Sequence, residues 1–440
     1  MPVLRPFYPY RYNPALFPDL APLVAPPYDV IRPDEQAALH RRHPLNVVRL
    51  ILNADPDPYT SAARLWHEWR EERYIVREAE PCFVFSLERF QVGEDTRERA
   101  GIYAAVRLEP FSSGRILPHE RTFSAPKEDR LRLLRACRAN LSPVFGLYPD
   151  HATVLEKLRE WSEARKAEVK LVDALGTEHR LWFLREPRLQ QWIREELAQE
   201  QVIIADGHHR YETALAYCEE LVRAGQNSPE AAHRYVMMYL TSLEDPGLVI
   251  LPTHRVLQTL ANLPSLKQRL EQYFHLRTYS TAEAEEFFRH LDQSAGQHCL
   301  GIGWGGEEKL LLGTLRDERT LEEWAGDLAP PVRNLDVTLL DRVVLQRLAG
   351  IVPDDEARAG RLWYTHSDSE ALQALQQGAA AVFFMRPPTI EDLLAVCRSG
   401  QVMPQKSTYF YPKLLSGLLF QALDEPMPAE PARAPVQIER

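Results

Sequence analysis

The stretch QVIIADGHHRYETALAYCEELVRAG, residues 201–225, decides how the chain folds around its most polar turn. Residues 202–204 are β-branched and apolar, which predicts a buried strand. The pair Asp206 and Gly207 predicts a tight turn. From His208 onward apolar residues repeat at helical spacing, and Gly225 ends the repeat. The sequence therefore predicts a strand that ends at Asp206 and a helix that begins at His208.

Four polar residues lie at this turn, namely Asp206, His208, His209 and Arg210. Free backbone N–H groups at a helix N-terminus attract anions, and the two histidines and the arginine add donors. The Asp206 carboxylate can hold a metal ion or orient a hydroxyl group. The combination suits a phosphate with a divalent cation.

Two plainer interpretations of the turn stay open. Asp206 can be an ordinary helix N-cap beside surface histidines. A zinc site is the other, since His208 and Glu212 are one helical turn apart, but the sequence has no HExxH pattern and no cysteine nearby.

The second polar motif is LPHERT, residues 117–122. A glutamate in a loop beside a histidine can act as general base for a hydroxyl substrate, which makes Glu120 a catalytic candidate and His119 a substrate-binding candidate. A solvated polar loop is the alternative.

The third motif is MPQKSTYFYPK, residues 403–413, in which two prolines favour a rigid, extended loop. Its Lys406, Ser407 and Thr408 can hold a phosphate or a carboxylate, and Lys413 can hold the substrate. The motif is not a P-loop, because the glycine-rich lead is missing. Its aromatic residues can stack a base, or they can form a core strand flanked by two surface lysines.

Smaller motifs place polar residues beside prolines or on apolar strands. In LPTHR, residues 251–255, we count His254 and Arg255 as substrate-binding candidates, although each reads as structural without further context. The same applies to Asp29 in APPYDV and to Asn46 and Arg49 in LNVVRL.

Composition limits the class of protein. The 440 residues carry 62 acidic and 52 basic side chains, a net charge of −10, and 45% of them are hydrophobic. These values are typical of a globular protein with a sizeable core, and the acidic balance disfavours nucleic-acid binding. Five scattered cysteines without a CxxC pair indicate reduced thiols and a cytoplasmic protein. No apolar run is long enough to span a membrane, and the first residues lack the apolar core of a signal peptide.

Alternating strand and helix patterns predict an α+β fold with mixed sheets and an additional C-terminal α+β unit. We expect an N-terminal segment over residues 1–150, a central segment with ADGHHR over 151–262, a C-terminal segment over 263–423 and a disordered tail over 424–440. One long helix is expected over residues 152–169.

Taken in order, APPYDV, LPHERT, ADGHHRYETAL, LPTHR and MPQKSTYFYPK resemble the bacterial and archaeal family catalogued as domain of unknown function 1015. ADGHHR is also similar to the DGHHR-type motif of ParB-like proteins, notably free-serine kinases, which convert L-serine to O-phosphoserine with a phosphoryl donor and Mg²⁺. The resemblance implies a ParB-like core in which Asp206 handles the metal and His208, His209 and Arg210 handle phosphates. The chain departs from the small ParB-like kinases in its size and its added C-terminal segments.

These features predict a cytoplasmic, Mg²⁺-dependent phosphotransferase that acts on the hydroxyl of a small metabolite. L-serine is the first candidate acceptor, and ATP, ADP or pyrophosphate is the donor. Catalytic roles fall to Glu120, Asp206 and His208, and no membrane or nucleic-acid partner is expected. The alternatives are a ParB-like nucleotide-sensing or DNA-associated regulator, and a metal-dependent hydrolase that uses Asp206, His208 and His209.

Overall fold

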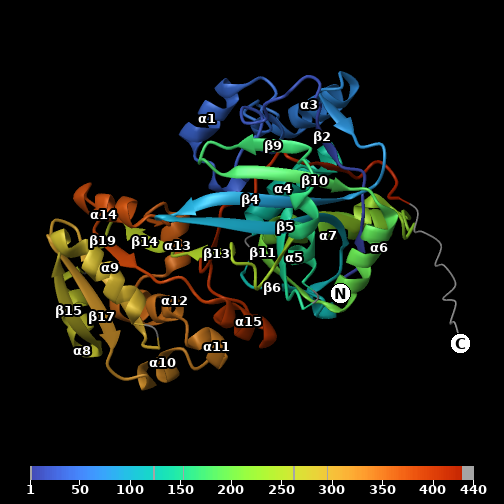
Figure 1. The fold of residues 1–440 in the computed structure, drawn as a ribbon. Helices are drawn as coiled ribbons and strands as arrows, with labels where there is room; N and C mark the ends of the chain where they lie inside the picture. Colours follow the sequence, from blue (N-terminus) through green and yellow to red (C-terminus); the bar gives the residue numbers. More distant parts are fainter. Residues whose placement is uncertain (1, 122–123, 152, 261–262, 295, 429–440) are drawn as a thin grey trace, which may run out of the picture. The chain divides into compact units, whose positions relative to one another are not determined.

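The computed structural model describes residues 2–121, 124–151, 153–260, 263–294 and 296–428 (Figure 1), so Thr122 of the LPHERT motif and residues 429–440 of the expected tail lie outside the described residues. The chain divides into two compact units. The first comprises Met1–Pro118, Thr122–Leu248 and Pro412–Arg440, and the second comprises His119–Arg121 and Val249–Tyr411. Within the described ranges, no helix is long and apolar enough to cross a membrane.

The first unit is built on a large mixed sheet, to which strands from both sides of residue 150 contribute. Along the sheet the strands follow the order β6 (Ile116–Pro118), β11 (Val202–Asp206), β8 (Val144–Tyr148), β12 (Tyr235–Ser242), β5 (Asp95–Arg107), β4 (Phe83–Val92), β10 (Glu178–Leu184) and β9 (Val169–Val172), and β1 (Leu4–Arg5) also pairs with β5. Parallel pairs join β11 to β6 and β12 to β8, and antiparallel pairs join the others. Two small pairings complete the unit, β2 (Tyr10–Tyr12) with β3 (Ile75–Arg77) and β7 (Ala139–Asn140) with β21 (Gln421–Ala422).

Helices of the first unit bury one face of this sheet. The apolar residues of four helices and of the strands form one core cluster, in which Leu134, Leu158, Ile193 and Tyr211 represent the four helices. The helices of the unit are η1 (Tyr28–Val30), α1 (Pro33–Arg42), α2 (Val48–Ile51), α3 (Pro58–Glu71), η2 (Phe111–Ser113), α4 (Ser124–Cys137), α5 (Val154–Glu163), α6 (Pro187–Glu196), η3 (Leu197–Gln199), α7 (His208–Arg223) and η4 (Ala232–Arg234).

The second unit has its own sheet and its own cores. Its strand order is β15 (Phe274–Ser280), β17 (Lys309–Leu315), β16 (Cys299–Trp304), β19 (Ala381–Phe384), β14 (His254–Leu257) and β18 (Leu362–Thr365), and β13 (Val249–Leu251) pairs separately with β20 (Tyr409–Tyr411). Its helices are α8 (Leu263–Tyr273), η5 (Thr281–Glu283), α9 (Ala284–Gln293), α10 (Arg319–Trp324), α11 (Pro330–Arg333), α12 (Asp336–Thr338), the π-helix η6 (Leu339–Ala349), α13 (Pro353–Arg358), α14 (Asp368–Gln376) and α15 (Ile390–Arg398). The expected mixed α+β architecture is confirmed.

Two local expectations need correction. The helix expected over residues 152–169 is shorter, because α5 ends at Glu163 and Val169 begins the edge strand β9, where it pairs with Leu181. Of the tail expected to be disordered, residues 424–428 are described and are ordered: Arg70 forms ion pairs with Glu425 at 2.5 Å and with Asp424 at 3.1 Å.

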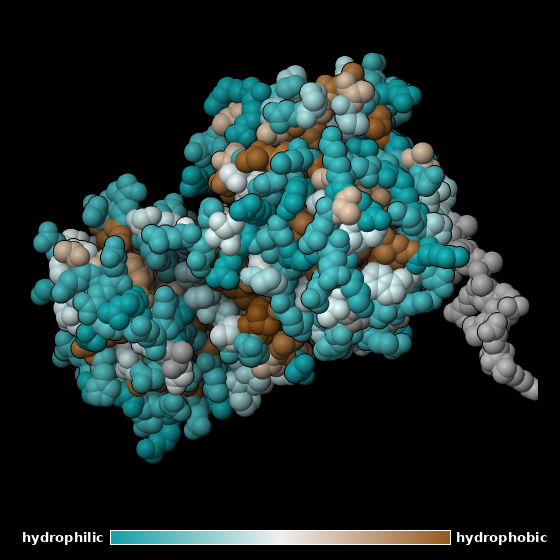
Figure 2. Space-filling model, in the orientation of Figure 1, coloured by the Kyte–Doolittle hydropathy of each residue, from teal (hydrophilic) through white to brown (hydrophobic). Residues whose placement is uncertain are grey.

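The visible surface is mostly hydrophilic, and hydrophobic residues are exposed on it in small groups (Figure 2). Among the described residues, the large hydrophobic side chains that stay exposed include Val172 and Leu175, at the end of β9 and in the turn that follows it. Small exposed groups of this kind are ordinary for a globular protein.

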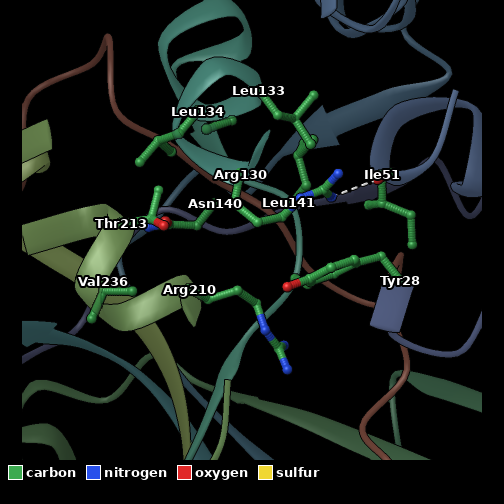
Figure 3. Close-up of a pocket in the computed structure, with 12 residues that line it drawn as sticks. Tyr28, Ile51, Arg130, Leu133, Leu134, Asn140, Leu141, Arg210, Thr213 and Val236 are labelled. Atoms are coloured by element: carbon green, nitrogen blue, oxygen red, sulfur yellow. Dashed lines mark hydrogen bonds between the residues drawn. The ribbon is translucent and has the colours of Figure 1, made fainter. Parts of the chain in front are cut away.

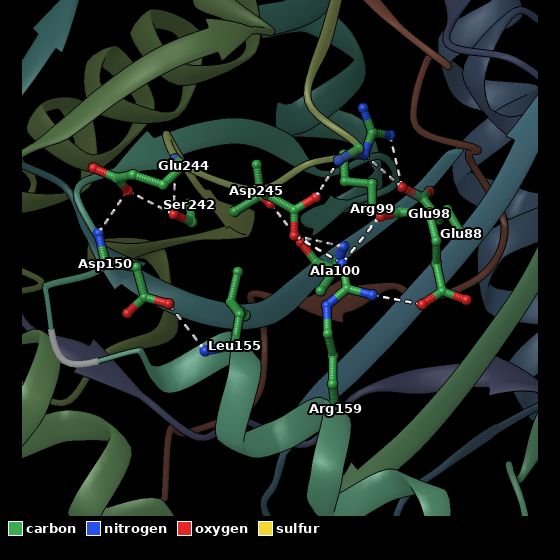
Figure 4. A network of polar contacts seen from close by, with 12 residues as sticks. Glu88, Glu98, Arg99, Ala100, Asp150, Leu155, Arg159, Ser242, Glu244 and Asp245 are labelled. Carbon is green, nitrogen blue, oxygen red and sulfur yellow. Dashed lines mark hydrogen bonds and ion pairs between the residues drawn. The ribbon is translucent and has the colours of Figure 1, made fainter. Parts of the chain in front are cut away.

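The sheet face opposite the helices of the first unit carries buried charges instead of a purely apolar core. Glu88 on β4 and Arg99 on β5 are cross-strand partners with fully buried side chains, and their ion pair spans 2.6 Å (Figure 4). His179 on β10 lies beside Glu88, with 3.5 Å between its Nδ1 and Glu88 Oε1, and its Nε2 lies 3.0 Å from Asp173 Oδ2. Charged groups this deep are stable only when each has a partner.

This network predicts a pH-dependent stability. Burial lowers the pKa of His179, but the hydrogen bond with Asp173 and the charge contacts with Glu88 and Asp173 outweigh it and raise that pKa to about 9. A raised histidine pKa stabilises the fold fully below pH 6.5, and that stabilisation is lost as the pH rises toward 9. Urea unfolding at pH 6, 7.5 and 9 should show that the free energy of unfolding falls by roughly 3 kcal/mol from pH 6 to pH 9. In His179→Gln this fall should be absent. Parallel pH curves for the two proteins would contradict a protonated His179.

Candidate functional site

The candidate site of the first unit lies where β11 ends and α7 begins. Gly207 is the N-cap residue of α7, with φ +85° and ψ +28°, and as a glycine it provides no side-chain cap. Asp206 is therefore not the N-cap, and the plainer interpretation of this aspartate is wrong. The first N–H groups of α7 follow directly after it, as the sequence predicts.

A β-bulge at Ala205 decides which way Asp206 points. Ile204 pairs with Gly146 and Asp206 pairs with Phe145, so two steps along β11 match one step along β8. Because paired residues share a face, the bulge turns Asp206 away from the helix-covered face of Ile204 and onto the face of Phe145. This is the face that carries the buried charges.

Two cations hold the Asp206 carboxylate. Lys413 Nζ lies 2.8 Å from Oδ1 and an Arg210 guanidinium nitrogen lies 2.6 Å from Oδ2. All three side chains are at least 85% buried, with exposed fractions of 15%, 12% and 11% for Asp206, Lys413 and Arg210. Burial favours the neutral carboxyl, but Lys413 and Arg210, with a smaller contribution from His208, hold the pKa of Asp206 well below its ordinary value. The carboxylate is ionised throughout the physiological pH range.

The other residues of the motif also lie at this helix end. Arg210 donates a second hydrogen bond to the Pro143 carbonyl, while its Nε is buried without a hydrogen-bond partner. His208 is buried and His209 is half-buried. Glu212, which would be the second ligand of a zinc ion bound by His208, forms an ion pair with Lys127.

A cavity of about 60 Å³ opens beside Arg210 (Figure 3). The Tyr28 ring lies 4.1 Å from the Arg130 guanidinium, and burial, with Asp29 also contributing, raises the pKa of Tyr28 to about 12. Leu133 and Leu134 of α4 form part of the apolar lining. The sequence motif APPYDV drew attention to Asp29, whereas the residue that lines the cavity is Tyr28.

Gly207 is required at this turn for two reasons, its positive φ and its closeness to Arg210. A Cβ on Gly207 would lie 2.9 Å from the Arg210 guanidinium, which Asp206 and Pro143 hold in place. Gly207→Ala should therefore cost about 1–2 kcal/mol from the backbone and also disturb the Asp206–Arg210 pair. Gly176, with φ +81° and open space around it, is the matched control for the backbone effect alone. Chemical denaturation of both variants measures the difference, and equal losses would show that Arg210 is not displaced.

The remaining predicted site residues belong to the second unit, where the structure brings several of them together. Glu120 Oε1 accepts a hydrogen bond of 2.7 Å from the Lys406 backbone N–H. His119 is fully buried, and its Nε2 lies 2.7 Å from the Thr408 hydroxyl. Ser407 donates to the Pro404 carbonyl at 2.5 Å, inside its own loop.

Arg255 also hydrogen-bonds to the loop that contains Lys406. It is 3% exposed and donates to the Lys406 carbonyl at 3.2 Å, while Lys406 itself has φ +57°. Asp341 on η6 interacts with Arg255, and burial raises the pKa of Asp341 to about 6 although Arg255 opposes the shift.

His254 is 1% exposed, and both of its ring nitrogens are engaged within the second unit. Nε2 lies 2.7 Å from Asp368 Oδ1, and Nδ1 accepts a 3.1 Å hydrogen bond from the Met385 backbone N–H. This arrangement is typical of a histidine that orients neighbouring backbone.

A metal ion can find only part of its ligands at Asp206. In the described part of the chain, no group of three or more His, Cys, Asp or Glu side chains gathers to hold one. Mg²⁺ usually combines one or two carboxylates with water and substrate phosphates. Asp206 therefore fits a cation that arrives with a phosphate ligand better than it fits a resident metal.

The family is decided by a match over most of the chain. The family model described as "Protein of unknown function (DUF1015)" matches residues 4–338. The chain belongs to the DUF1015 family. Asp206, Arg210 and Glu120 lie within the matched range, and Lys413 lies beyond it.

The DUF1015 chain matches no curated protein. Among solved structures it is similar to a conserved hypothetical protein from Pyrococcus furiosus, with 14% identity, coverage of 71% and 92% of the two chains and a TM-score of 0.34. It is similar to a free serine kinase in complex with AMP, with 13% identity, 70% and 86% coverage and a TM-score of 0.35. It is also similar to SbnI from Staphylococcus aureus, with 11% identity, 71% and 85% coverage and a TM-score of 0.36. TM-scores of this size are too low to transfer an activity to this chain.

Proposed function

We propose that this DUF1015 protein is a phosphotransferase that phosphorylates the hydroxyl of a small metabolite, with L-serine as the first candidate and ATP, ADP or pyrophosphate as donor. The observation that carries the proposal is Asp206 between Lys413 and Arg210 at the start of α7. The proposal includes a ParB-like core and a cytoplasmic location, as the sequence resemblance and the cysteine pattern predict.

The charges at this turn favour an anion. Lys413 and Arg210 carry two positive charges and Asp206 carries one negative charge. The helix N-terminus adds roughly half a positive charge. The buried Arg210 Nε and the first N–H groups of α7 can donate hydrogen bonds to phosphate oxygens. Asp206 keeps both cations ordered before the phosphate arrives, so little reorganisation is needed when it binds.

Phosphoryl transfer needs positioning and charge neutralisation more than covalent chemistry from the protein. In the proposal, Arg210, His208 and His209 neutralise charge on the transferred group, and Asp206 orients Lys413 and Arg210. Mg²⁺ that arrives with the donor would neutralise further phosphate charge, with Asp206 as its protein ligand. Lys406, Ser407 and Thr408 stay predicted phosphate ligands, and His119, His254 and Arg255 stay predicted substrate residues.

Glu120 is the proposed general base for the acceptor hydroxyl. Its side chain is 18% exposed, its Oε1 accepts the hydrogen bond from the Lys406 N–H, and its Oε2 lies 3.9 Å from His119 Nε2. A positioned base typically contributes 10²–10⁴-fold, so Glu120→Gln should lower the phosphorylation rate by about that factor. Glu128→Gln, which removes a charge from the surface pair with Arg132, is the control. An unchanged rate for Glu120→Gln would remove Glu120 from the mechanism.

The test of the function is a donor and acceptor screen with the purified full-length chain. The protein is incubated with Mg²⁺, L-serine and, in turn, ATP, ADP and pyrophosphate, and ³¹P NMR follows O-phosphoserine. The proposal predicts product with at least one donor. Donor consumption without L-serine would favour a hydrolase, and no turnover with L-serine, L-homoserine, L-threonine or glycerate would contradict a phosphotransferase.

A further inference from the structure

We propose that Arg99 is a positioning residue that fixes Lys413 against Asp206. The inference rests on the proposed function in that Lys413 and Asp206 are part of the phosphate site. The residue-level claim, that buried Arg99 sets the place of Lys413, can be tested without any activity.

Arg99 hydrogen-bonds to the backbone of the residue that precedes Lys413. Its guanidinium donates a 2.9 Å hydrogen bond to the Pro412 carbonyl, and its side chain is completely buried. Pro412 has a fixed φ, which limits the directions that the following residue can take. Lys413 then reaches Asp206 at 2.8 Å. The backbone anchor and the side-chain contact are thus on adjacent residues.

Glu88, itself held by further residues, binds the Arg99 guanidinium. Glu88 Oε2 accepts from Arg99 Nε at 2.8 Å, and the Tyr239 hydroxyl donates to the same oxygen at 3.2 Å. Behind Glu88 lie His179 and Asp173, so negative and positive groups alternate from Asp173 through His179 and Glu88 to Arg99. Burial opposes the charge on Glu88, but Arg99 and His179 lower its pKa to about 2. These contacts hold the Arg99 guanidinium against Glu88.

The same guanidinium also lies against the strand that positions Asp206. It stacks over the Phe145 ring at 4.8 Å, and Phe145 is the cross-strand partner of Asp206. Arg99 thus contacts the residue paired with Asp206 and the residue that precedes Lys413. The Arg99 side chain therefore contacts a neighbour of each member of the Lys413–Asp206 pair.

The energetics favour a positioning role over a purely stabilising one. A buried ion pair stabilises a fold little compared with well-packed apolar residues of the same volume, because both charges lose their hydration. An apolar pair at positions 88 and 99 could fill the space, but it could not donate to the Pro412 carbonyl.

The test compares two variants with a control. Arg99→Met removes the grip on Pro412 but leaves Glu88 unpaired, so it can lose the fold. Glu88→Gln/Arg99→Met removes both charges and keeps a hydrogen-bonding group for Tyr239. If Arg99→Met unfolds the protein, this double variant tests the proposal. Arg135→Met is the control, because Arg135 pairs with Glu220 on the surface of the same unit and, in the described part of the chain, forms no ion pair or hydrogen bond with Arg99 or its chain neighbours.

The first readout is the labelling rate of the Lys413 amine by an acylating reagent, followed by peptide mass spectrometry. Lys413 is 12% exposed, whereas Lys170 is 66% exposed and serves as the internal reference. Lys413 labelling should rise at least roughly fivefold in the double variant and stay unchanged in Arg135→Met. The second readout is serine phosphorylation, with an expected fall in kcat of roughly 10- to 100-fold for the double variant.

The outcomes separate the two proposals. Faster Lys413 labelling in a protein that shows no kinase activity supports the positioning of Lys413 and contradicts the proposed function. Unchanged labelling in the folded double variant overturns the role of Arg99, whatever the activity. A labelling increase of the same size in Arg135→Met also overturns it, because the effect would then reflect a general loosening of the unit.

Discussion

Asp206→Asn is expected to lower kcat/KM for serine phosphorylation by 10²–10³-fold or more, the loss that follows removal of one preorganised electrostatic group. The amide keeps the shape of the side chain but removes the negative charge that holds Lys413 and Arg210. The two cations then repel each other and lose their fixed positions. Steady-state kinetics with the donor identified by ³¹P NMR measures the effect.

Asp150→Asn is the matched control for this substitution. Asp150 also stands at a helix N-terminus, where its carboxylate accepts from the Val154 and Leu155 N–H groups at 2.9 and 3.0 Å. The change there should cost up to about 1 kcal/mol of stability and leave the kinetics unaltered. Full activity of Asp206→Asn would place the phosphate site elsewhere, even if the protein is a kinase.

Arg99→Met is expected to destabilise the first unit by about 3–5 kcal/mol, because it leaves the buried Glu88 carboxylate without its cation. His179 faces the other carboxylate oxygen at 3.5 Å and cannot replace the guanidinium, of which two nitrogens lie within 2.8 Å of Oε2. Urea unfolding, followed by a probe in the first unit, measures the loss.

Arg135→Met is the surface counterpart. Arg135 makes a similar pair with Glu220, at 2.6 Å, but its side chain is 44% exposed. Exposed ion pairs contribute roughly 0–1 kcal/mol, so the free energy of unfolding of this variant should be close to that of the wild-type protein. Equal losses at both positions would show that burial does not set the strength of the Glu88–Arg99 pair.

The sequence predicts the strand, turn and helix around Asp206 well, because their determinants are local. The apolar run before the turn, the glycine inside it and the helical repeat after it each indicate one element, and β11, Gly207 and α7 follow. The bulge at Ala205 was not predicted, because it depends on the register with β8. That bulge decides the face on which Asp206 lies.

Contacts between distant parts of the chain are where sequence reasoning falls short. Lys413 was singled out as a substrate residue, yet its partner is Asp206, 207 residues away. Glu88, Arg99 and His179 are not among the sequence candidates, since a charged residue of a strand usually faces solvent, whereas these three are buried. A charged residue at an inward position of an apolar strand is the signal that could have found them.

The most direct test of the central claim is hydrogen–deuterium exchange of the full-length chain with and without saturating donor and Mg²⁺. If the N-terminus of α7 and the Lys413 segment form the phosphate site, peptides that cover residues 206–211 and 412–415 should gain protection, and β15 should not change. The same protection should be absent in Asp206→Asn. Protection confined to other peptides, at a donor concentration that supports turnover, would contradict the account.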